Sequence, residues 1–336
     1  MKASWLKNFW HILLSGVAVL IFVLAIKALY RLTKTVKLED VMTAIAQIPL
    51  SHLIVAVLVV AFGYGTLTLY DFIALRHLGR GKQIRYANVA LTSFTAYAIS
   101  HTIGANLLTA TGIRYRHYHY RGLSNNEIAN IVWLVSMAFT FGISTLIGLS
   151  LTLHPEITVQ LLAQLDKSWG IFENVFYVKV LGIMMLSVIT AIILYAGKQG
   201  KHVVIRGWRF DLPPAPVVLQ QIVISILDLS TVALVLYLLL PPSEHISYWA
   251  TFSAFIQAMA VGILSHVPGG LGVFEVTMIA SLPQIDRTQI LAVLLIFRII
   301  YYILPFFVAL LLLLGYEIYS YQRKKTVKPK LPSEHS

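Results

Sequence analysis

The sequence has no cysteine and few charged residues. Only 12% of its 336 residues are Asp, Glu, Lys or Arg, whereas 58% are hydrophobic. The absence of cysteine excludes a disulfide framework and a thiolate metal site. The scarcity of charge, together with long apolar stretches, predicts an all-α polytopic membrane protein with no soluble domain.

Acidic residues are especially scarce, with 14 Asp and Glu against 26 Lys and Arg and a net charge of +12. Such an excess can indicate a nucleic-acid partner, so the positions of the basic residues decide its meaning. Most of them fall in five clusters, at 2–7, 76–85, 114–121, 198–209 and 323–330. The positive-inside rule places all five clusters, and both termini, on the cytoplasmic side of the membrane. We therefore expect a lipid bilayer and no nucleic acid as the partner.

Six apolar segments reach the roughly 20 residues that cross a bilayer as a helix. They occupy 9–30, 53–75, 131–153, 175–195, 217–240 and 291–316. The helical spacing of apolar residues in 31–51 predicts an amphipathic helix on the membrane interface. The acidic segment 154–174 is predicted to be an external loop.

Two further apolar segments, 91–112 and 249–282, are interrupted by polar or helix-breaking residues. The second contains Pro268, three nearby glycines and Glu275, and neither of its flanks alone spans a bilayer. Backbone that leaves a helix at membrane depth is tolerated where it is buried in protein or lines a cavity. We predict two re-entrant helical hairpins, with two ordinary short helices joined by a turn as the alternative for the second.

The two predicted hairpins share a short motif, because Ser-His-x-x-Gly occurs at 100–104 and again at 265–269. The first hairpin is expected to enter from the cytoplasm and the second from outside. This arrangement is typical of inverted-topology repeats, which expose a midplane site to either side alternately. We expect repeats at about 53–153 and 217–316 within one membrane domain, 1–320, followed by a disordered basic tail at 321–336.

Four ionisable residues fall at membrane depth: Asp71, Asp228, Glu275 and Arg298. A charge at a helix centre costs about 2.5–3.5 kcal/mol on insertion scales, so these residues should pair or face water. Arg298 and Tyr302 are four residues apart and should share a helical face. We predict that Glu275 pairs with Arg298 and leaves the guanidinium group able to bind a phosphate. A static structural pair is the alternative.

Each hairpin should also present a helix N-terminus to the bilayer interior, near 106–109 and near 270–273. Unpaired N–H groups and the positive end of the helix dipole attract anions there. Gly269, Gly270 and Gly272 would let a ligand or another backbone approach closely.

Histidine in water titrates near neutral pH, so the two motif histidines, His101 and His266, join Asp71 and Asp228 as candidates for a proton or polar relay. Buried neutral histidines bonded to the backbone are the alternative. His117 and His119 alternate rather than share a helical face and have no carboxylates near them at ligand spacing, and no nucleophile has an evident partner base. We therefore expect no metal site, no cofactor and no catalytic residues.

The segment 112–121 is rich in basic and aromatic residues and contains Arg114 and Arg116. Such a run can stack on single-stranded nucleic acid, but at a cytoplasmic membrane interface it is typical of lipid-phosphate contact. Simple anchoring of the helix at the interface is the alternative.

Four runs in order resemble those of the lysylphosphatidylglycerol synthetase transmembrane-region family, and most closely the YbhN-type inner membrane proteins. The runs are Tyr70-Asp71-Phe72-Ile73-Ala74, 112–118 with Gly122-Leu123, 268–275 and 298–305, and the resemblance spans about 5–320. The family includes MprF, whose membrane domain is a flippase for aminoacylated phosphatidylglycerol. The resemblance implies lipid handling and points to eight residues as functional. These are Arg114, Arg116, Gly269, Gly270, Gly272, Glu275, Arg298 and Tyr302.

The preferred hypothesis is a phospholipid translocator whose headgroup site lies between the two hairpins. Its substrate would be an anionic or modified phospholipid. The alternative is a non-transporting scaffold or an accessory subunit of a lipid-modifying enzyme. We expect no enzymatic activity, because the aminoacyl-transferring domain of MprF is absent from this sequence. Beyond the lipid, another copy of the chain or a lipid-modifying enzyme is the expected partner.

Overall fold

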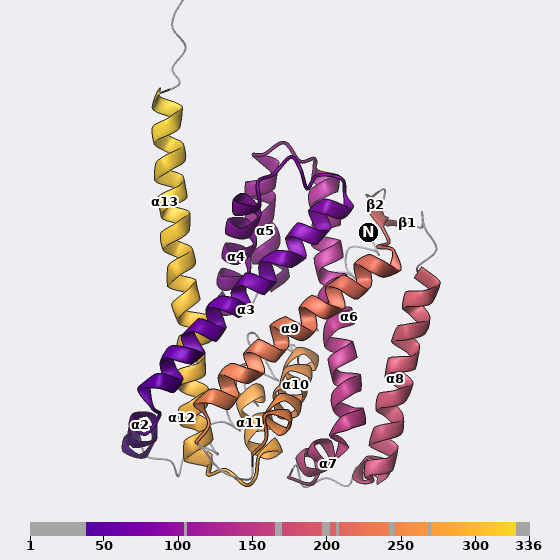
Figure 1. Ribbon diagram of the computed structural model, residues 1–336, viewed down its shortest axis with the longest axis vertical. Coiled ribbons are helices and arrows are strands. Elements are labelled where there is room, and N and C mark those ends of the chain that lie inside the picture. The colour runs from indigo at the N-terminus through magenta and orange to yellow at the C-terminus, as the bar shows by residue number, and fades with distance from the viewer. Residues whose placement is uncertain are drawn as a thin grey trace, which may run out of the picture.

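The computed structural model describes residues 38–103, 106–164, 170–196, 202–205, 208–241, 246–265, 267 and 270–326. Within these ranges the chain is a bundle of helices with one short β-ribbon (Figure 1). The all-α membrane class is confirmed. The predicted crossing at 9–30 and the tail beyond 326 lie outside the described residues.

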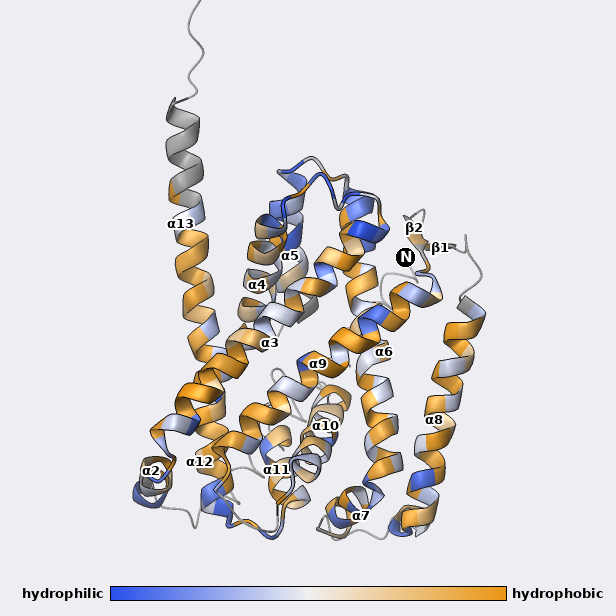
Figure 2. Cartoon of the chain, viewed as in Figure 1, coloured by the Kyte–Doolittle hydropathy of each residue, from blue (hydrophilic) through white to orange (hydrophobic). Residues whose placement is uncertain are grey.

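Five helical segments of the described chain are long and apolar enough to cross a bilayer. Four are single helices: α3 (Leu50–His77), α6 (Asn125–Leu153), α8 (Val175–Ala196) and α9 (Ala215–Leu239). The fifth joins α12 (Arg287–Arg298), η3 (Ile299–Ile303) and α13 (Leu304–Thr326). Figure 2 shows hydrophobic residues along these helices and hydrophilic residues at both ends of the bundle. Large apolar side chains on these helices are exposed, among them Leu58, Phe176 and Leu311, and such an apolar surface requires a lipid surrounding. Five of the six predicted crossings are therefore confirmed.

Two pairs of shorter helices form hairpins that enter the bundle from opposite ends (Figure 1). The first pair is α4 (Tyr86–Ile103) with α5 (Asn106–His119), and the second is α10 (Tyr248–Leu264) with α11 (Val273–Ser281). We call the end that carries the loop 78–85 the Arg80 end, and the end that carries the loop 282–286 the Asp286 end. The α4–α5 hairpin enters from the Arg80 end and the α10–α11 hairpin from the Asp286 end, as the sequence predicts for opposed re-entrant elements.

Local sequence signals fix the starts of several helices. Ser124 accepts a hydrogen bond from the backbone N–H of Glu127, and the Glu127 carboxylate accepts one from Ser124 N, which forms a capping box at the start of α6. Ser247 caps α10 and Asp286 caps α12 in the same way, through one side-chain oxygen each. These caps satisfy N–H groups that a helix start leaves without partners. They set where the chain turns back into the bundle.

Helices α3, α6 and α9 form the centre of the bundle, and α8 lies at its edge (Figure 1). At the contact of α6 with α9, a Cβ on Gly142 would lie 2.0 Å from Ser225 Oγ, so no larger residue fits there. Small residues let membrane helices approach closely where dispersion forces hold them together. The same Ser225 hydroxyl lies 2.7 Å from the Tyr70 hydroxyl of α3, so three helices meet at this point.

The last crossing is not one continuous α-helix, which corrects the prediction for 291–316. Residues Ile299–Ile303 form a π-helical turn directly before Pro305. Proline lacks the N–H that would bond the carbonyl of Tyr301 in an α-helix. Tyr64 Oη of α3 donates to Tyr301 O at 3.1 Å, and Thr102 Oγ1 of α4 donates to Tyr302 O at 3.2 Å. The break is therefore held by side chains from α3 and from the tip of the first hairpin.

Several segments between the crossings have structure that hydropathy alone does not show. The amphipathic helix expected in 31–51 is present as α2 (Leu38–Ala46), and residues 31–37 lie outside the described chain. The expected loop 154–174 instead contains α7 (Pro155–Gln164) and η1 (Gly170–Glu173). Part of the basic segment 198–209 forms an antiparallel ribbon of β1 (His202–Ile205) and β2 (Trp208–Asp211). Helix α13 continues to Thr326, beyond the expected domain boundary at 320.

Candidate functional site

A cavity of about 280 Å³ lies between the first hairpin, the central helices α3, α6 and α9, and residues of α10 and η3. Its volume is near the lower end of ligand pockets, enough for a small polar headgroup but not for acyl chains. Phe139 and Thr140 at its edge are exposed. The polar groups around it come from five elements: Tyr70 of α3, Tyr97, Ser100 and His101 of α4, Thr111 and Arg114 of α5, Ser136 and Thr140 of α6, and Asp228 of α9. Met259 of α10 and Tyr301 of η3 complete the wall on the side of the second hairpin.

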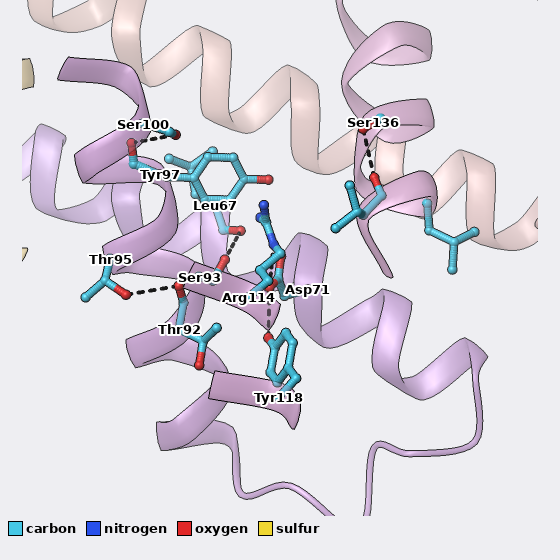
Figure 3. A network of polar contacts seen from close by, with 12 residues as sticks. Leu67, Asp71, Thr92, Ser93, Thr95, Tyr97, Ser100, Arg114, Tyr118 and Ser136 are labelled. Carbon is cyan, nitrogen blue, oxygen red and sulfur yellow. Dashed lines mark hydrogen bonds and ion pairs between the residues drawn. The ribbon is translucent and has the colours of Figure 1, made fainter. Parts of the chain in front are cut away.

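Arg114 is held in the cavity wall by a buried carboxylate. Its Nε and Nη2 donate to the Asp71 carboxylate at 2.8–3.1 Å, and Tyr118 Oη donates to the other face of the same carboxylate at 2.8 Å. The guanidinium carbon lies 5.0 Å from the centre of the Tyr97 ring, a cation–π contact. Figure 3 shows Arg114 between Tyr97 and Asp71, with Tyr118 beyond the carboxylate. We call Asp71–Arg114 the inner pair.

The inner pair ties the second helix of the first hairpin to crossing helix α3. The side chains of Arg114 and Asp71 are only 3% and 0% exposed, so neither charge is hydrated from outside the bundle. Burial of two charges is favourable only when geometry is good and further hydrogen bonds satisfy the remaining atoms, and the Tyr118 bond supplies one of these. The result is a cation fixed at the wall of a cavity whose lining is otherwise largely apolar.

Arg116 does not accompany Arg114 into the cavity. It is exposed, and the structure places it outside the residues that line the cavity. Two residues along an α-helix correspond to a rotation of about 200°, so side chains two apart point to opposite sides. The expectation that both arginines act together at the cytoplasmic surface is therefore wrong for Arg114, which lies inside the bundle.

Glu275 pairs with Arg298, as the sequence predicts. Arg298 donates to Glu275 Oε1 through Nε at 2.7 Å and also through Nη2. The other carboxylate oxygen, Oε2, accepts from the backbone N–H of Gly272 at 2.7 Å. We call Glu275–Arg298 the capping pair, because its carboxylate caps α11. Arg298 also lies over the Tyr302 ring at 5.8 Å, and neither arginine nor tyrosine lines the cavity.

The glycine-rich bend before α11 adopts a backbone that only glycine tolerates readily. Gly270 has φ of 61° and Gly272 has φ of 81°, both in the left-handed region. This conformation turns the Gly272 N–H toward Glu275, so the protein's own carboxylate occupies the helix N-terminus at which an anion was expected. Gly269 and His266, which the sequence also points to, lie outside the described residues.

Asp228 and His101 line the same cavity as Arg114. Asp228 is 6% exposed, and its Oδ1 has no hydrogen-bond partner among the described residues. His101 Nδ1 is also without a partner there, and the imidazole ring stacks on Tyr301 with centroids 6.3 Å apart. A cavity wall with one fixed cation and two unsatisfied buried groups is typical of a site for a polar ligand or water.

A column of aromatic rings connects the two ion pairs. Phe274, the neighbour of Glu275 in sequence, stacks on Phe297 at 6.3 Å, Phe297 on Tyr301 at 5.3 Å, and Tyr301 on His101 at 6.3 Å. His101 lies 5.6 Å from Tyr97, the ring under the guanidinium group of the inner pair. Packed rings of this kind transmit displacement because they are not compressible. The column thus runs from Phe274, near the start of α11, to His101 and Tyr97 in the wall of the cavity.

The structure thus divides the predicted site residues into two groups. The cavity group contains His101, Arg114 and Asp228, with Asp71 behind Arg114, and the second group contains Gly270, Gly272, Glu275, Arg298 and Tyr302. Sequence reasoning missed the cavity tyrosines Tyr70, Tyr97 and Tyr301. Tyr97 is four residues before His101, and that spacing on one face of α4 was the signal for it. Within the described chain no three His, Asp or Glu residues are placed to hold a metal ion.

Comparison with known proteins finds relatives that match about nine tenths of this chain. An uncharacterized protein of Synechocystis sp. is 30% identical over 321 residues, which cover 95% of this chain and 96% of the relative. Inner membrane protein YbhN of Escherichia coli is 27% identical over 305 residues, 90% of this chain and 92% of that protein. Phosphatidylglycerol lysyltransferase of Staphylococcus aureus is 22% identical over 299 residues, 88% of this chain but 33% of that enzyme. No family model matches the chain.

Proposed function

Since the chain belongs to the lysylphosphatidylglycerol synthetase transmembrane-region family, together with the YbhN-type inner membrane proteins, we propose that it is a phospholipid translocator. Its multi-pass helical architecture agrees with the inner membrane location named for the Escherichia coli relative. The substrate is an anionic or modified phospholipid of the bacterial cytoplasmic membrane. In our proposal the Arg80 end faces the cytoplasm, because the basic loop 76–85 lies there.

The observation that carries this proposal is the buried Arg114 in the wall of the cavity. A guanidinium group binds phosphate oxygens in a fixed planar geometry, and the attraction is strong where water is excluded. Asp71 fixes the position of the group by two of its nitrogens, so it is preorganised for a headgroup. We assign the phosphate contact to Arg114 rather than to Arg298, because Arg298 does not line the cavity.

The cavity volume of about 280 Å³ suits a headgroup whose acyl chains remain in the bilayer. Transfer then requires that the cavity open to one side and then to the other. The two hairpins enter from opposite ends (Figure 1), and the cavity is lined by the first hairpin and by Met259 of the second, so a rocking motion of one against the other exposes the headgroup alternately. The aromatic column between the ion pairs couples the two hairpin tips during this motion.

The proposal is tested with purified protein in phosphatidylethanolamine vesicles that contain a trace of fluorescently labelled phosphatidylglycerol. A membrane-impermeant quencher reports the fraction of probe in the outer leaflet over time. The wild-type chain should accelerate probe transfer over protein-free vesicles. The double variant D71N/R114Q, which removes both buried charges together, should lose at least about tenfold of this rate, as expected when a charged hydrogen bond to substrate is lost. The matched control is R85Q, which removes an exposed arginine at the same end of the bundle.

Two results would contradict the proposal in different ways. A folded wild-type protein that transfers neither this probe nor a labelled phosphatidylethanolamine would favour the non-transporting scaffold. Equal transfer rates for wild type and D71N/R114Q would mean that the protein moves lipid, but not through the cavity at Arg114.

A further inference from the structure

Asp228 differs from the other ionisable residues at membrane depth because it has no charged partner. Asp71 pairs with Arg114 and Glu275 pairs with Arg298, whereas Asp228 forms no salt bridge with any described residue. It lies about midway along α9, is 6% exposed, and has one carboxylate oxygen fully enclosed without a hydrogen-bond partner in the described chain. An ionised carboxylate in such a place is strongly disfavoured, whereas a protonated one is tolerated.

The surroundings of Asp228 contain several groups that can carry a proton. Tyr70 of α3, Tyr97 and His101 of α4, and Tyr301 of η3 line the same cavity, and Tyr64 of α3 lies close to Asp228 outside the lining. Arg114 of α5 is the one permanent cation among the described lining residues, and Asp71 of α3 is its counterion. The walls from α6 and α10 contribute Ser136, Thr140 and Met259, which do not titrate. Asp228 is therefore the one carboxylate among the described cavity residues, and His101 is the one imidazole.

The charge balance of the cavity links proton binding to lipid binding. Asp71 already balances the charge of Arg114, so while the cavity is empty of ligand Asp228 ionises only when the cavity is open to water. A phosphate bound at Arg114 then adds a net negative charge to the cavity that Asp228 lines. Two anions in one small cavity repel each other, so binding of the phosphate promotes protonation of the carboxylate. By linkage, protonation of Asp228 promotes phosphate binding to the same extent.

From this arrangement we infer that Asp228 binds one proton together with the lipid phosphate and releases it on the opposite side of the membrane. The inference rests on the proposed translocator function and names its energy source. On the side of entry the carboxylate takes up a proton, –COO⁻ + H⁺ → –COOH, and the phosphate binds. On the side of exit the phosphate leaves, the carboxyl group loses the same proton, and the cavity returns with Asp228 ionised. One monoanionic lipid and one proton cross together, so no net charge moves.

The test uses the same vesicles with a pH difference imposed across the membrane and the electrical potential held at zero by potassium and valinomycin. If one proton accompanies each lipid, the ratio of labelled phosphatidylglycerol between the two leaflets at steady state shifts about tenfold for each pH unit. The probe accumulates in the leaflet that faces the alkaline side. Because this ratio is an equilibrium quantity, it does not depend on the orientation of the protein in the vesicles.

Asp228→Asn should abolish the shift, so that the ratio of the probe between the two leaflets no longer depends on the pH difference. Asp40→Asn is the matched control, since it makes the same change at an exposed site on α2 and should keep the full shift. Protein-free vesicles give the passive background. If Asp228→Asn does not fold, infrared spectra of the wild-type protein in nanodiscs replace it: addition of phosphatidylglycerol should increase the band of a protonated carboxyl group.

The other possible results each overturn the inference, and one of them also overturns the translocator function. Wild-type protein that moves the probe to a ratio independent of the pH difference overturns the inference and leaves the translocator function standing. The inference is also overturned if a folded Asp228→Asn variant still shows the pH-dependent shift in the leaflet ratio. It is overturned as well if the infrared band of the protonated carboxyl group does not change when lipid is added. Wild-type protein that moves no probe overturns the translocator function and the inference together.

Discussion

The two hairpins are built alike but leave their charged groups in different situations. In each, the second helix is tied to a crossing helix by an arginine–carboxylate pair: α5 to α3 by the inner pair Asp71–Arg114, and α11 to α12 by the capping pair Glu275–Arg298. The inner pair is almost fully buried and its arginine lines the cavity, whereas Arg298 is 24% exposed and lies outside that cavity.

This difference assigns separate tasks to the two hairpins. In the capping pair the carboxylate binds both the N-terminus of α11 and Arg298, and neither Glu275 nor Arg298 lines the cavity. In the inner pair the carboxylate is on the crossing helix, and the guanidinium group is carried by the hairpin that would move. We therefore expect the first hairpin to bind the ligand and the second to act as a structural counterpart.

The largest effect on stability should follow when one charge of the inner pair is removed. Asp71→Asn leaves Arg114 buried without a counterion and should lower the free energy of unfolding by about 3–5 kcal/mol. Unfolding of the purified protein in mixed micelles measures this. The double variant Asp71→Leu with Arg114→Met replaces the pair with apolar groups and should recover most of the loss. A single variant as stable as wild type would show that the pair is not buried as described.

Removal of the capping carboxylate should have a smaller effect. Glu275→Gln weakens the bond to the Gly272 N–H and the ion pair with Arg298, and we expect a loss of about 1–3 kcal/mol. The loss is limited because Arg298, at 24% exposed, can reach solvent when its partner is gone. The same unfolding measurement checks it. A loss larger than that of Asp71→Asn would reverse the ranking of the two pairs.

The backbone of the second hairpin can be tested without touching a charge. Gly272→Ala forces a side chain into a φ of 81° and should destabilise the protein by about 1–2 kcal/mol. Gly65→Ala is the matched control: this glycine is inside helix α3, and a Cβ there meets nothing within 4 Å. The control should be neutral or stabilising by up to about 1 kcal/mol. Thermal unfolding of both variants, measured side by side, gives the difference; equal effects would contradict the assigned bend.

The smallest expected effect concerns the hydroxyl group that supports the inner pair. Tyr118→Phe removes one hydrogen bond to Asp71, 2.8 Å long, and keeps the buried ring, so we expect a loss of about 0.5–1.5 kcal/mol. Tyr115→Phe, at a side chain that is 44% exposed, is the control and should change stability less. Probe transfer by Tyr118→Phe should also slow, since Asp71 is held less firmly. Unchanged stability and rate would mean that the hydroxyl does not support the carboxylate.

Hydropathy was sufficient to predict the frame of the molecule. The predicted crossing at 53–75 is observed as Leu50–His77, and that at 217–240 as Ala215–Leu239, because about 20 apolar residues have few alternatives to a spanning helix. The ribbon of β1 and β2 was not predicted, because a strand of four residues is too short for its alternation of polar and apolar residues to be recognised in the sequence. The π-turn was not predicted either, although Pro305 marked its position.

The candidate site was predictable only in part. The contact of Glu275 with Arg298 followed from two charges at membrane depth that each needed a partner. The partner of Asp71 was missed because Arg114 stands in a run of basic and aromatic residues that, taken as a whole, is typical of an interface. The periodicity of a helix would have separated the buried from the exposed positions of that run. The cavity itself could not be predicted, because it depends on how seven elements pack.

Accessibility of the cavity from each side of the membrane is the most direct test of the central claim, and the absence of cysteine makes the chain a clean background for it. Ser136→Cys places one thiol on the cavity wall, and Leu311→Cys places one on an outward apolar face that is 68% exposed. A membrane-impermeant maleimide reacts with thiolates in contact with water and not with thiols in lipid. The account predicts that Ser136→Cys is labelled from either side of the membrane in separate experiments, while Leu311→Cys is labelled from neither. Labelling of Ser136→Cys from one side only, or from neither, would contradict alternating access.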